Sequence, residues 1–172
     1  ALSLATMWAT RAERFQALMQ GWDLDPARAG HYAFNDLHAV LALLGSGEMA
    51  QAERWVARCA ERALAAEDVR RDNHLMAREV GLPLMRGVLA LARGDFDGAA
   101  DLLYPARQQA ARFGGSHAQR DLIDLTLLAA SARGGRRSLG RALVNERRMA
   151  KPTTPLTRHW LEQLGDSEEA RA

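Results

Sequence analysis

Three turns of the chain share one pattern, in which a glycine is followed five residues later by a small residue. The pairs are Gly47 and Ala52, Gly94 and Ala99, and Gly135 and Gly140. Glycine permits the left-handed backbone of a tight turn between two helices. A small residue one turn into the following helix lets the two backbones approach closely. The pattern therefore predicts three pairs of antiparallel helices.

The amino-acid composition favours helices throughout. Alanine and leucine dominate, and Ile123 is the only isoleucine. Strands favour β-branched and aromatic residues, whereas helices favour Ala, Leu, Arg, Glu and Met. We therefore predict an all-α fold, built from helix hairpins stacked as a short right-handed superhelix. A generic helical bundle with glycine turns is the alternative.

The spacing of apolar residues and turn residues gives the expected boundaries. Helices are predicted at residues 3–20, 29–44, 49–66, 82–92, 96–113, 117–133, 139–150 and 155–164. Asn73 or its neighbour, Asp95, Ser116 with Gln119, and Thr154 are the predicted caps. Gly81 and Pro83 predict an irregularity where the fourth helix begins. A chain of 172 residues suits one domain, 1–164, followed by a polar tail, 165–172.

Several classes of protein do not fit this sequence. Cys59 is the only cysteine, which excludes a disulfide scaffold. No apolar run approaches the roughly 20 residues of a membrane helix. Arg11 and Glu13 interrupt the first apolar stretch, unlike a signal peptide. We therefore expect a cytoplasmic protein without membrane contact. Because Ala1 already falls in a helical pattern, we also expect a longer repeat array upstream.

Four short segments carry a resemblance to a known family. They are Phe34-Asn35-Asp36-Leu37-His38-Ala39, Gly94-Asp95-Phe96, Tyr104-Pro105-Ala106-Arg107 and Gly114-Gly115-Ser116-His117-Ala118-Gln119-Arg120-Asp121. The helix pairs are similar to tetratricopeptide repeats, although the turn glycines lie further apart than the repeat of about 34 residues. From Trp8 to Trp160 the chain resembles the C-terminal part of the tetratricopeptide repeat protein 38 family. The resemblance implies a helical-repeat fold and no particular enzymatic activity.

One set of polar residues is predicted to bind a partner. Stacked helix pairs create a concave surface lined by the first helix of each pair. His117, Arg120 and Asp121 share one helix face behind a capped N-terminus, where a carboxylate or phosphate could bind. The alternative is that Arg120 and Asp121 pair with neighbouring helices. The predicted polar contacts are Asn35, His38, Arg86, His117, Arg120 and Asp121. We expect an interaction module or scaffold that binds a peptide or partner helix.

An arginine-rich stretch supports a different interpretation, namely nucleic-acid binding. It contains Arg133, Arg136, Arg137, Arg141, Arg147 and Arg148. Such a run can neutralise phosphates. Aromatic residues that would stack on bases do not interleave it, so a solvated outer surface is the competing interpretation.

No catalytic arrangement is visible in the sequence. Ser116 is used as a helix cap, and Cys59 lies on an apolar stripe, where a buried and inert thiol is expected. His31 and His38 share a helix face, but a metal site needs three or four ligands. We therefore expect no catalytic residue, metal or cofactor. An enzyme completed by residues outside this chain and pairing of two copies through the first helix remain alternatives.

Overall fold

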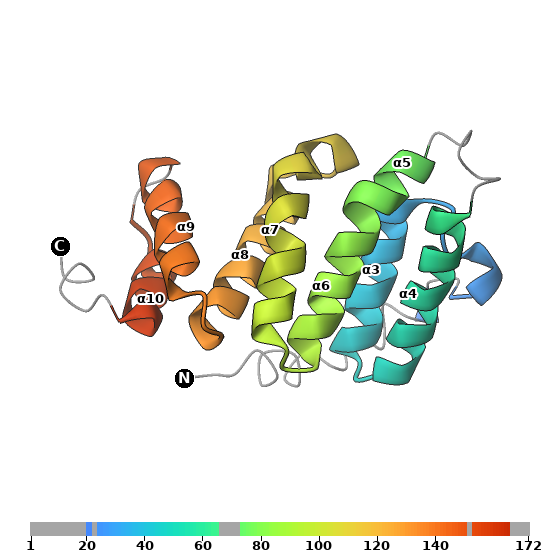
Figure 1. The fold of residues 1–172 in the computed structure, drawn as a ribbon, viewed down its shortest axis with the longest axis horizontal. Helices are drawn as coiled ribbons and strands as arrows, with labels where there is room; N and C mark the ends of the chain where they lie inside the picture. The colour runs from blue at the N-terminus through green and yellow to red at the C-terminus, as the bar shows by residue number, and fades with distance from the viewer. Residues whose placement is uncertain (1–19, 22–23, 66–72, 151–152, 166–172) are drawn as a thin grey trace.

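The computed structural model describes residues 20–21, 24–65, 73–150 and 153–165, and every regular element in these ranges is a helix. This confirms the predicted all-α class. The helices stand side by side in a row, as Figure 1 shows. The expected helix at 3–20, apart from its last residue, and the tail beyond Gly165 lie outside the described residues.

The elements in chain order can be followed in Figure 1. They are the 3-10 turn η1 (Pro26–Arg28), α3 (Ala33–Gly45), α4 (Met49–Leu64), α5 (His74–Met76), the π-helical turn η3 (Ala77–Gly81), α6 (Leu82–Ala92), α7 (Phe96–Phe113), α8 (His117–Arg133), α9 (Arg137–Ala150) and α10 (Pro155–Leu164). The π-helical turn lies where Gly81 and Pro83 predict an irregularity.

Helices α3 and α4, α6 and α7, and α8 and α9 form three hairpins. In the first two turns, glycine has the expected left-handed conformation, with φ of 87° at Gly47 and 83° at Gly94. The corresponding prediction for Gly135 is wrong, because that residue is not in the left-handed region. Its N–H instead donates to Asp97 Oδ1 of α7 (2.8 Å). A Cβ atom on the preceding Gly134 would lie 2.6 Å from the same oxygen.

The small residues of the pattern lie at close contacts between helices, as expected. Ala52 and Ala99 are completely buried. A Cβ atom on Gly140 would lie 2.6 Å from Leu164 Cδ2 of α10, and one on Gly87 would lie 2.6 Å from Leu103 Cγ of α7. Side chains at these glycines would push the helices apart, so the close packing depends on their absence.

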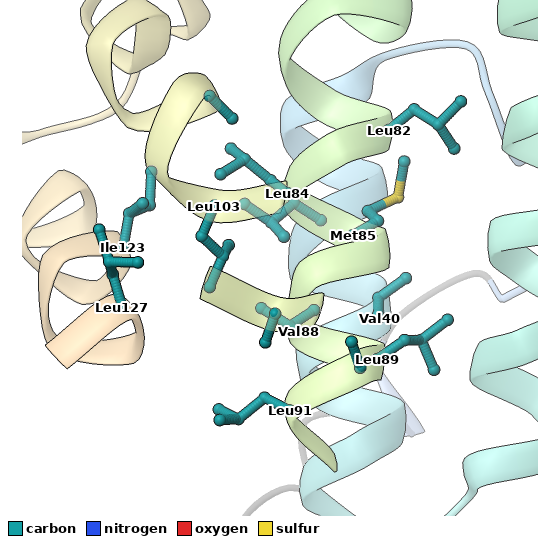
Figure 2. Close-up of a cluster of buried hydrophobic side chains, with 14 of the residues drawn as sticks. Val40, Leu82, Leu84, Met85, Val88, Leu89, Leu91, Leu103, Ile123 and Leu127 are labelled. Carbon is teal, nitrogen blue, oxygen red and sulfur yellow. The ribbon is translucent and has the colours of Figure 1, made fainter. Parts of the chain in front are cut away.

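Helix α6 forms the centre of the hydrophobic core. Figure 2 shows Leu82, Met85 and Leu89 on the side of α6 that faces α3 and α4. Leu84, Val88 and Leu91 lie on the side that faces α7 and α8. Because α6 is apolar on two sides, it joins the first hairpin to the rest of the molecule.

Three of the predicted helix caps agree with the structure, and the one predicted at Asn73 does not. Asp95 accepts from the N–H of Gly98 (3.0 Å), Ser116 forms a capping box with Gln119, and Thr154 accepts from the N–H of Thr157 (3.3 Å). The side chain of Asn73 does not cap α5, because its Oδ1 accepts from the N–H of Ala33 instead (3.2 Å).

Helix α3 begins at Ala33 rather than at the expected residue 29. Gly30 has a φ of 82°, which is incompatible with a right-handed helix. Its N–H donates to Asp36 Oδ1 (3.0 Å), so the carboxylate holds this turn in front of the helix. A short 3-10 turn, η1, precedes it.

Candidate functional site

A narrow apolar crevice lies between α3, α6 and α8, which are the first helices of the three hairpins. Its cavity volume is about 30 Å³. The buried lining residues come from all three helices and from α7, and they are Leu37, Leu84, Val88, Leu103 and Ile123. Leu122 of α8 also lines the crevice and is 44% exposed. The crevice is therefore apolar inside and has an exposed apolar side chain at its edge.

His38 and Gln119 form the contact between α3 and α8 at the edge of this crevice. His38 Nδ1 donates to the backbone carbonyl of Phe34 one turn earlier (2.8 Å). In the neutral ring, Nε2 is then the acceptor. Gln119 Nε2 lies 3.4 Å from this atom and donates to it. Gln119 Oε1 accepts from the N–H of Ser116 (2.7 Å), so the capping box fixes the amide that contacts α3.

The glycine pair before α8 allows this contact. Gly114 and Gly115 have φ values of 98° and 79°. A Cβ atom on Gly115 would lie 2.7 Å from Phe34 Cε2. The ring of Phe34 in turn lies against the His38 imidazole, with 4.4 Å between ring centroids. The start of α8 can therefore approach α3 only because Gly115 has no side chain.

Arg120 borders the same crevice and carries its positive charge. Its Nη1 donates to the carbonyl of Gly115 (2.6 Å), and its Nη2 lies 3.3 Å from His117 Nδ1. Within the described part of the chain, no carboxylate forms an ion pair with Arg120. The carbonyl of Gly115 and the ring of His117 thus hold the guanidinium in position, and no carboxylate of the described residues neutralises its charge.

Asp121, on the next position of α8, has a structural partner. Arg147 of α9 binds it through two hydrogen bonds, of 2.5 and 2.8 Å. These bonds raise the pKa of Arg147, and partial burial opposes them. The interpretation that Asp121 pairs with a neighbouring helix is therefore confirmed, whereas Arg120 forms no such pair.

Arg107 forms two further ion pairs beside the pair of Arg147 and Asp121. Arg107 of α7 donates to Asp124 of α8 (2.5 Å) and to Glu146 of α9 (2.8 Å). Partial burial works against the charged form of Arg107, but these hydrogen bonds raise its pKa overall. We call the five residues Arg107, Asp121, Asp124, Glu146 and Arg147 the ionic clasp, because they join three helices.

Two of the predicted polar contacts lie away from the crevice. Asn35 borders a separate, open depression with His31, Tyr32 and Trp55. Arg86 is exposed on α6. At about 100° per residue, it lies on the opposite side of that helix from Leu84 and Val88. Among the six predicted contacts, His38 and Arg120 border the crevice. His117 and Asp121 line an adjacent open depression together with Arg120.

The arginines of the 133–151 stretch are directed to several neighbouring elements. Arg136 pairs with Asp101 of α7 (2.6 Å) and lies 4.0 Å from Asp97. Arg133 lies over the ring of Phe96, 5.9 Å from its centroid. Arg147 belongs to the ionic clasp.

The remaining three arginines of this stretch are Arg137, Arg141 and Arg148. Arg141 Nη2 donates to the carbonyl of Leu164 of α10 (3.4 Å). Because carboxylates neutralise Arg136 and Arg147, the stretch has less charge for phosphates than its sequence indicates. Nucleic-acid binding through it stays a prediction.

Three residues of the crevice were not singled out from the sequence. Phe34 and Leu122 are not among the predicted contacts, and Gln119 is predicted only as part of a helix cap. Gln119 and His38 are 81 residues apart, so their contact leaves no local pattern. A detectable signal existed for Leu122, since it is an apolar residue next to a polar helix face.

Cys59 and Asp36 form a buried pair between α3 and α4. Burial raises the pKa of the Cys59 thiol, and the neighbouring Asp36 carboxylate adds to this effect. The thiolate is therefore disfavoured, which agrees with the expectation of an inert thiol. Among the described residues, no cluster of three His, Cys, Asp or Glu side chains has the arrangement of a metal site.

No protein-family model matches the chain, and no solved structure matches it. The resemblance to the tetratricopeptide repeat protein 38 family therefore stays a prediction based on the segments quoted above. Within the described ranges, none of the helices is both long and apolar enough to cross a bilayer.

Proposed function

We propose that the protein is an interaction module of degenerate tetratricopeptide-like repeats, and that it binds a peptide segment of a partner at the crevice. In this proposal α3, α6 and α8 line the concave side of a short superhelix. The observation that carries it is the apolar crevice shared by these three helices. Two residues predicted from the sequence to contact a partner, His38 and Arg120, border this crevice.

The interior of the crevice supports binding of an apolar side chain. Its lining is mostly aliphatic, and a volume of about 30 Å³ suits a short aliphatic group rather than an aromatic ring. Leu122 extends this apolar surface to the outside. Helical-repeat and helix-in-groove complexes commonly obtain affinity from such apolar anchors.

The charge of Arg120 favours a peptide that carries an acidic residue beside its apolar side chain. The guanidinium lacks a carboxylate partner among the described residues, and Gly115 and His117 hold it in place. A glutamate or aspartate beside the apolar anchor would form a charge-assisted hydrogen bond there. The proposed recognition element is therefore a short aliphatic side chain next to an acidic one.

The test uses a random peptide library displayed on phage, from which peptides are selected on the immobilised protein. Selected peptides are synthesised, and their Kd is measured by fluorescence anisotropy. We expect enrichment of an aliphatic residue beside Asp or Glu. The double variant His38→Ala with Arg120→Ala should bind about tenfold more weakly, which corresponds to about 1.4 kcal/mol. Asn35→Ala is the matched control on α3 and should leave the Kd unchanged.

A second peptide, in which Asn or Gln replaces the acidic residue, tests the contact with Arg120 separately from the apolar contact in the crevice. The wild-type protein should lose affinity for the amide peptide, whereas Arg120→Ala should bind both peptides equally. If the folded double variant binds selected peptides as tightly as the wild type, the crevice is not the binding surface.

A further inference from the structure

A small notch with polar walls lies where the loop before α3, the end of α4 and the start of α5 meet. In Figure 1 these segments come together at the upper ends of α3 and α4. The notch has a volume of about 40 Å³ and is lined by Gly30, His31, Arg62, Ala63, Asn73, His74 and Ala77. It is separate from the crevice, with which it shares no lining residue.

Two buried nitrogen atoms of this notch lack hydrogen-bond partners. They are Nη1 of Arg62 and Nδ1 of His74. His74 is only 7% exposed. A buried polar group without a partner costs about 1–3 kcal/mol, and native structures contain few of them. Arg62 and His74 both line the notch, so a group that accepts hydrogen bonds could reach both side chains from there.

Two acceptor atoms near the notch, Asn73 Oδ1 and Asp36 Oδ1, are occupied by other groups. Asn73 Oδ1 accepts from the N–H of Ala33 (3.2 Å). Asp36 Oδ1, behind Gly30, accepts from the N–H of Gly30 (3.0 Å) and from Trp55 Nε1 (3.1 Å). No carboxylate of the described residues forms an ion pair with Arg62. Arg62 thus lines the notch, and no carboxylate in the described part of the chain is paired with its charge.

The guanidinium of Arg62 is held in a fixed position. Its Nη2 donates to the carbonyl of Ala27 (2.9 Å) in the loop before α3. A Cβ atom on Gly30 would lie 2.8 Å from Arg62 Cδ, so the arginine crosses the loop where glycine leaves room. An arginine fixed in this way loses little side-chain entropy when it binds a ligand.

We propose that this notch binds the carboxylate group of a small organic acid. An arginine and an imidazole are donors to an oxyanion, and guanidinium matches the planar carboxylate in shape. The volume of about 40 Å³ admits a group of this size but little more. One carboxylate oxygen would accept from Arg62 Nη1, and the other would accept from the N–H at His74 Nδ1. This inference does not depend on the proposed peptide-binding function.

The experiment is an NMR titration with sodium acetate at neutral pH, with sodium chloride exchanged to keep the ionic strength constant. The ring signals of His74 should shift and reach saturation. Those of His159, which is exposed on α10, should move little. Arg62→Gln should weaken the apparent affinity about tenfold or more. Arg58→Gln, on the same helix and exposed, is the matched control and should bind as the wild type.

Two further measurements keep the proposal testable if Arg62→Gln disturbs the fold. His74→Asn is the second variant, and its response is followed through the guanidinium signal of Arg62. Acetamide, which has the shape of acetate without its charge, should produce no saturating shift. A linear response to acetate, an equal response to acetamide, or unchanged binding by folded Arg62→Gln would overturn the proposal. Any of these results would leave an ordered water as the occupant of the notch.

Discussion

At the scale of the single residue, Asp36 is a buried carboxyl group that forms no ion pair with any other residue that the structure describes. It is 3% exposed, its Oδ1 accepts two hydrogen bonds, and its Oδ2 has no partner. Burial raises the pKa of Asp36, and the hydrogen bonds from Gly30 and Trp55 only partly offset this effect. Protonated Asp36 is therefore favoured in the folded chain more than in the unfolded chain.

The sign of the resulting pH dependence follows from linkage. The unfolded chain releases the proton of residue 36 near its ordinary pKa of 3.8, and the folded chain releases it at a higher pH. The contribution of Asp36 to stability is complete below the unfolded pKa and is lost as the pH rises through the folded pKa. Asp36→Asn should therefore gain stability relative to the wild type as the pH rises above about 4 toward the folded-state pKa, by about 1.4 kcal/mol per unit of pKa elevation.

Urea unfolding at several pH values measures this difference directly. Glu162→Gln, an exposed change on α10, is the control and should run parallel to the wild type. A constant difference in the free energy of unfolding between Asp36→Asn and the wild type at every pH would contradict the assignment.

At the scale of the element, the ionic clasp joins α7, α8 and α9 through ion pairs. The side chains of Arg147 and Asp121 are only 14% and 25% exposed, in contrast to 60% and 65% for the surface pair Arg58 and Glu61. Salt and water screen a surface pair strongly and a partly buried pair much less. The clasp should therefore contribute more than an ordinary ion pair.

A double-mutant cycle tests this contribution. Arg147→Met leaves Asp121 partly buried without its bidentate partner, and we expect a loss of about 2 kcal/mol in the free energy of unfolding. The coupling energy between Arg147→Met and Asp121→Asn should be about 1 kcal/mol or more. Arg147→Lys should restore little of it, because lysine lacks the planar fork. The Arg58 and Glu61 pair should give a coupling of about 0.3–0.5 kcal/mol, and equal couplings for the two pairs would refute the argument.

The sequence could predict those turns and caps whose determinants lie close together in the chain. Glycine and cap residues act within a few positions of the chain, so the turns at Gly47 and Gly94 and the caps at Asp95, Ser116 and Thr154 were correctly predicted. The role of Gly135 depends on Asp97, which lies 38 residues away on another helix. The predicted cap at Asn73 was wrong for the same reason, because its side chain accepts from the N–H of Ala33, 40 residues away.

The candidate site was less predictable than the helices for the same reason. A helical face can be read from spacing, and this reading correctly placed His117, Arg120 and Asp121 together. Which of them would be neutralised depended on α9, since Arg147 binds Asp121, whereas Arg120 has no carboxylate partner in the described ranges. The orphaned atoms of Arg62 and His74 have no sequence signal, because only the fold reveals which polar atoms lack partners.

At the scale of the whole molecule, the helices form a row in which each element packs mainly on its neighbours (Figure 1). Helix α6 contacts α3, α4, α7 and α8, whereas α10 packs on α9 and α8. In a stacked-repeat protein, stability is a sum of local and nearest-neighbour terms, so the ends open before the centre. A bundle with one shared core opens as a single unit.

Native-state hydrogen exchange distinguishes these two architectures. For a stacked array, the backbone amides of α10 should exchange with a lower opening free energy than those of Leu84 to Leu91 in α6. Their exchange should also depend less steeply on denaturant, because opening of the end exposes less surface.

Gly140→Ala provides the perturbation, since its Cβ would collide with Leu164 of α10. In a stacked array this change should speed exchange in α9 and α10 and leave α6 almost unaffected. If α6 and α10 respond by the same amount, the molecule is one cooperative bundle, and the superhelix assumed for the concave binding face would lose its physical basis.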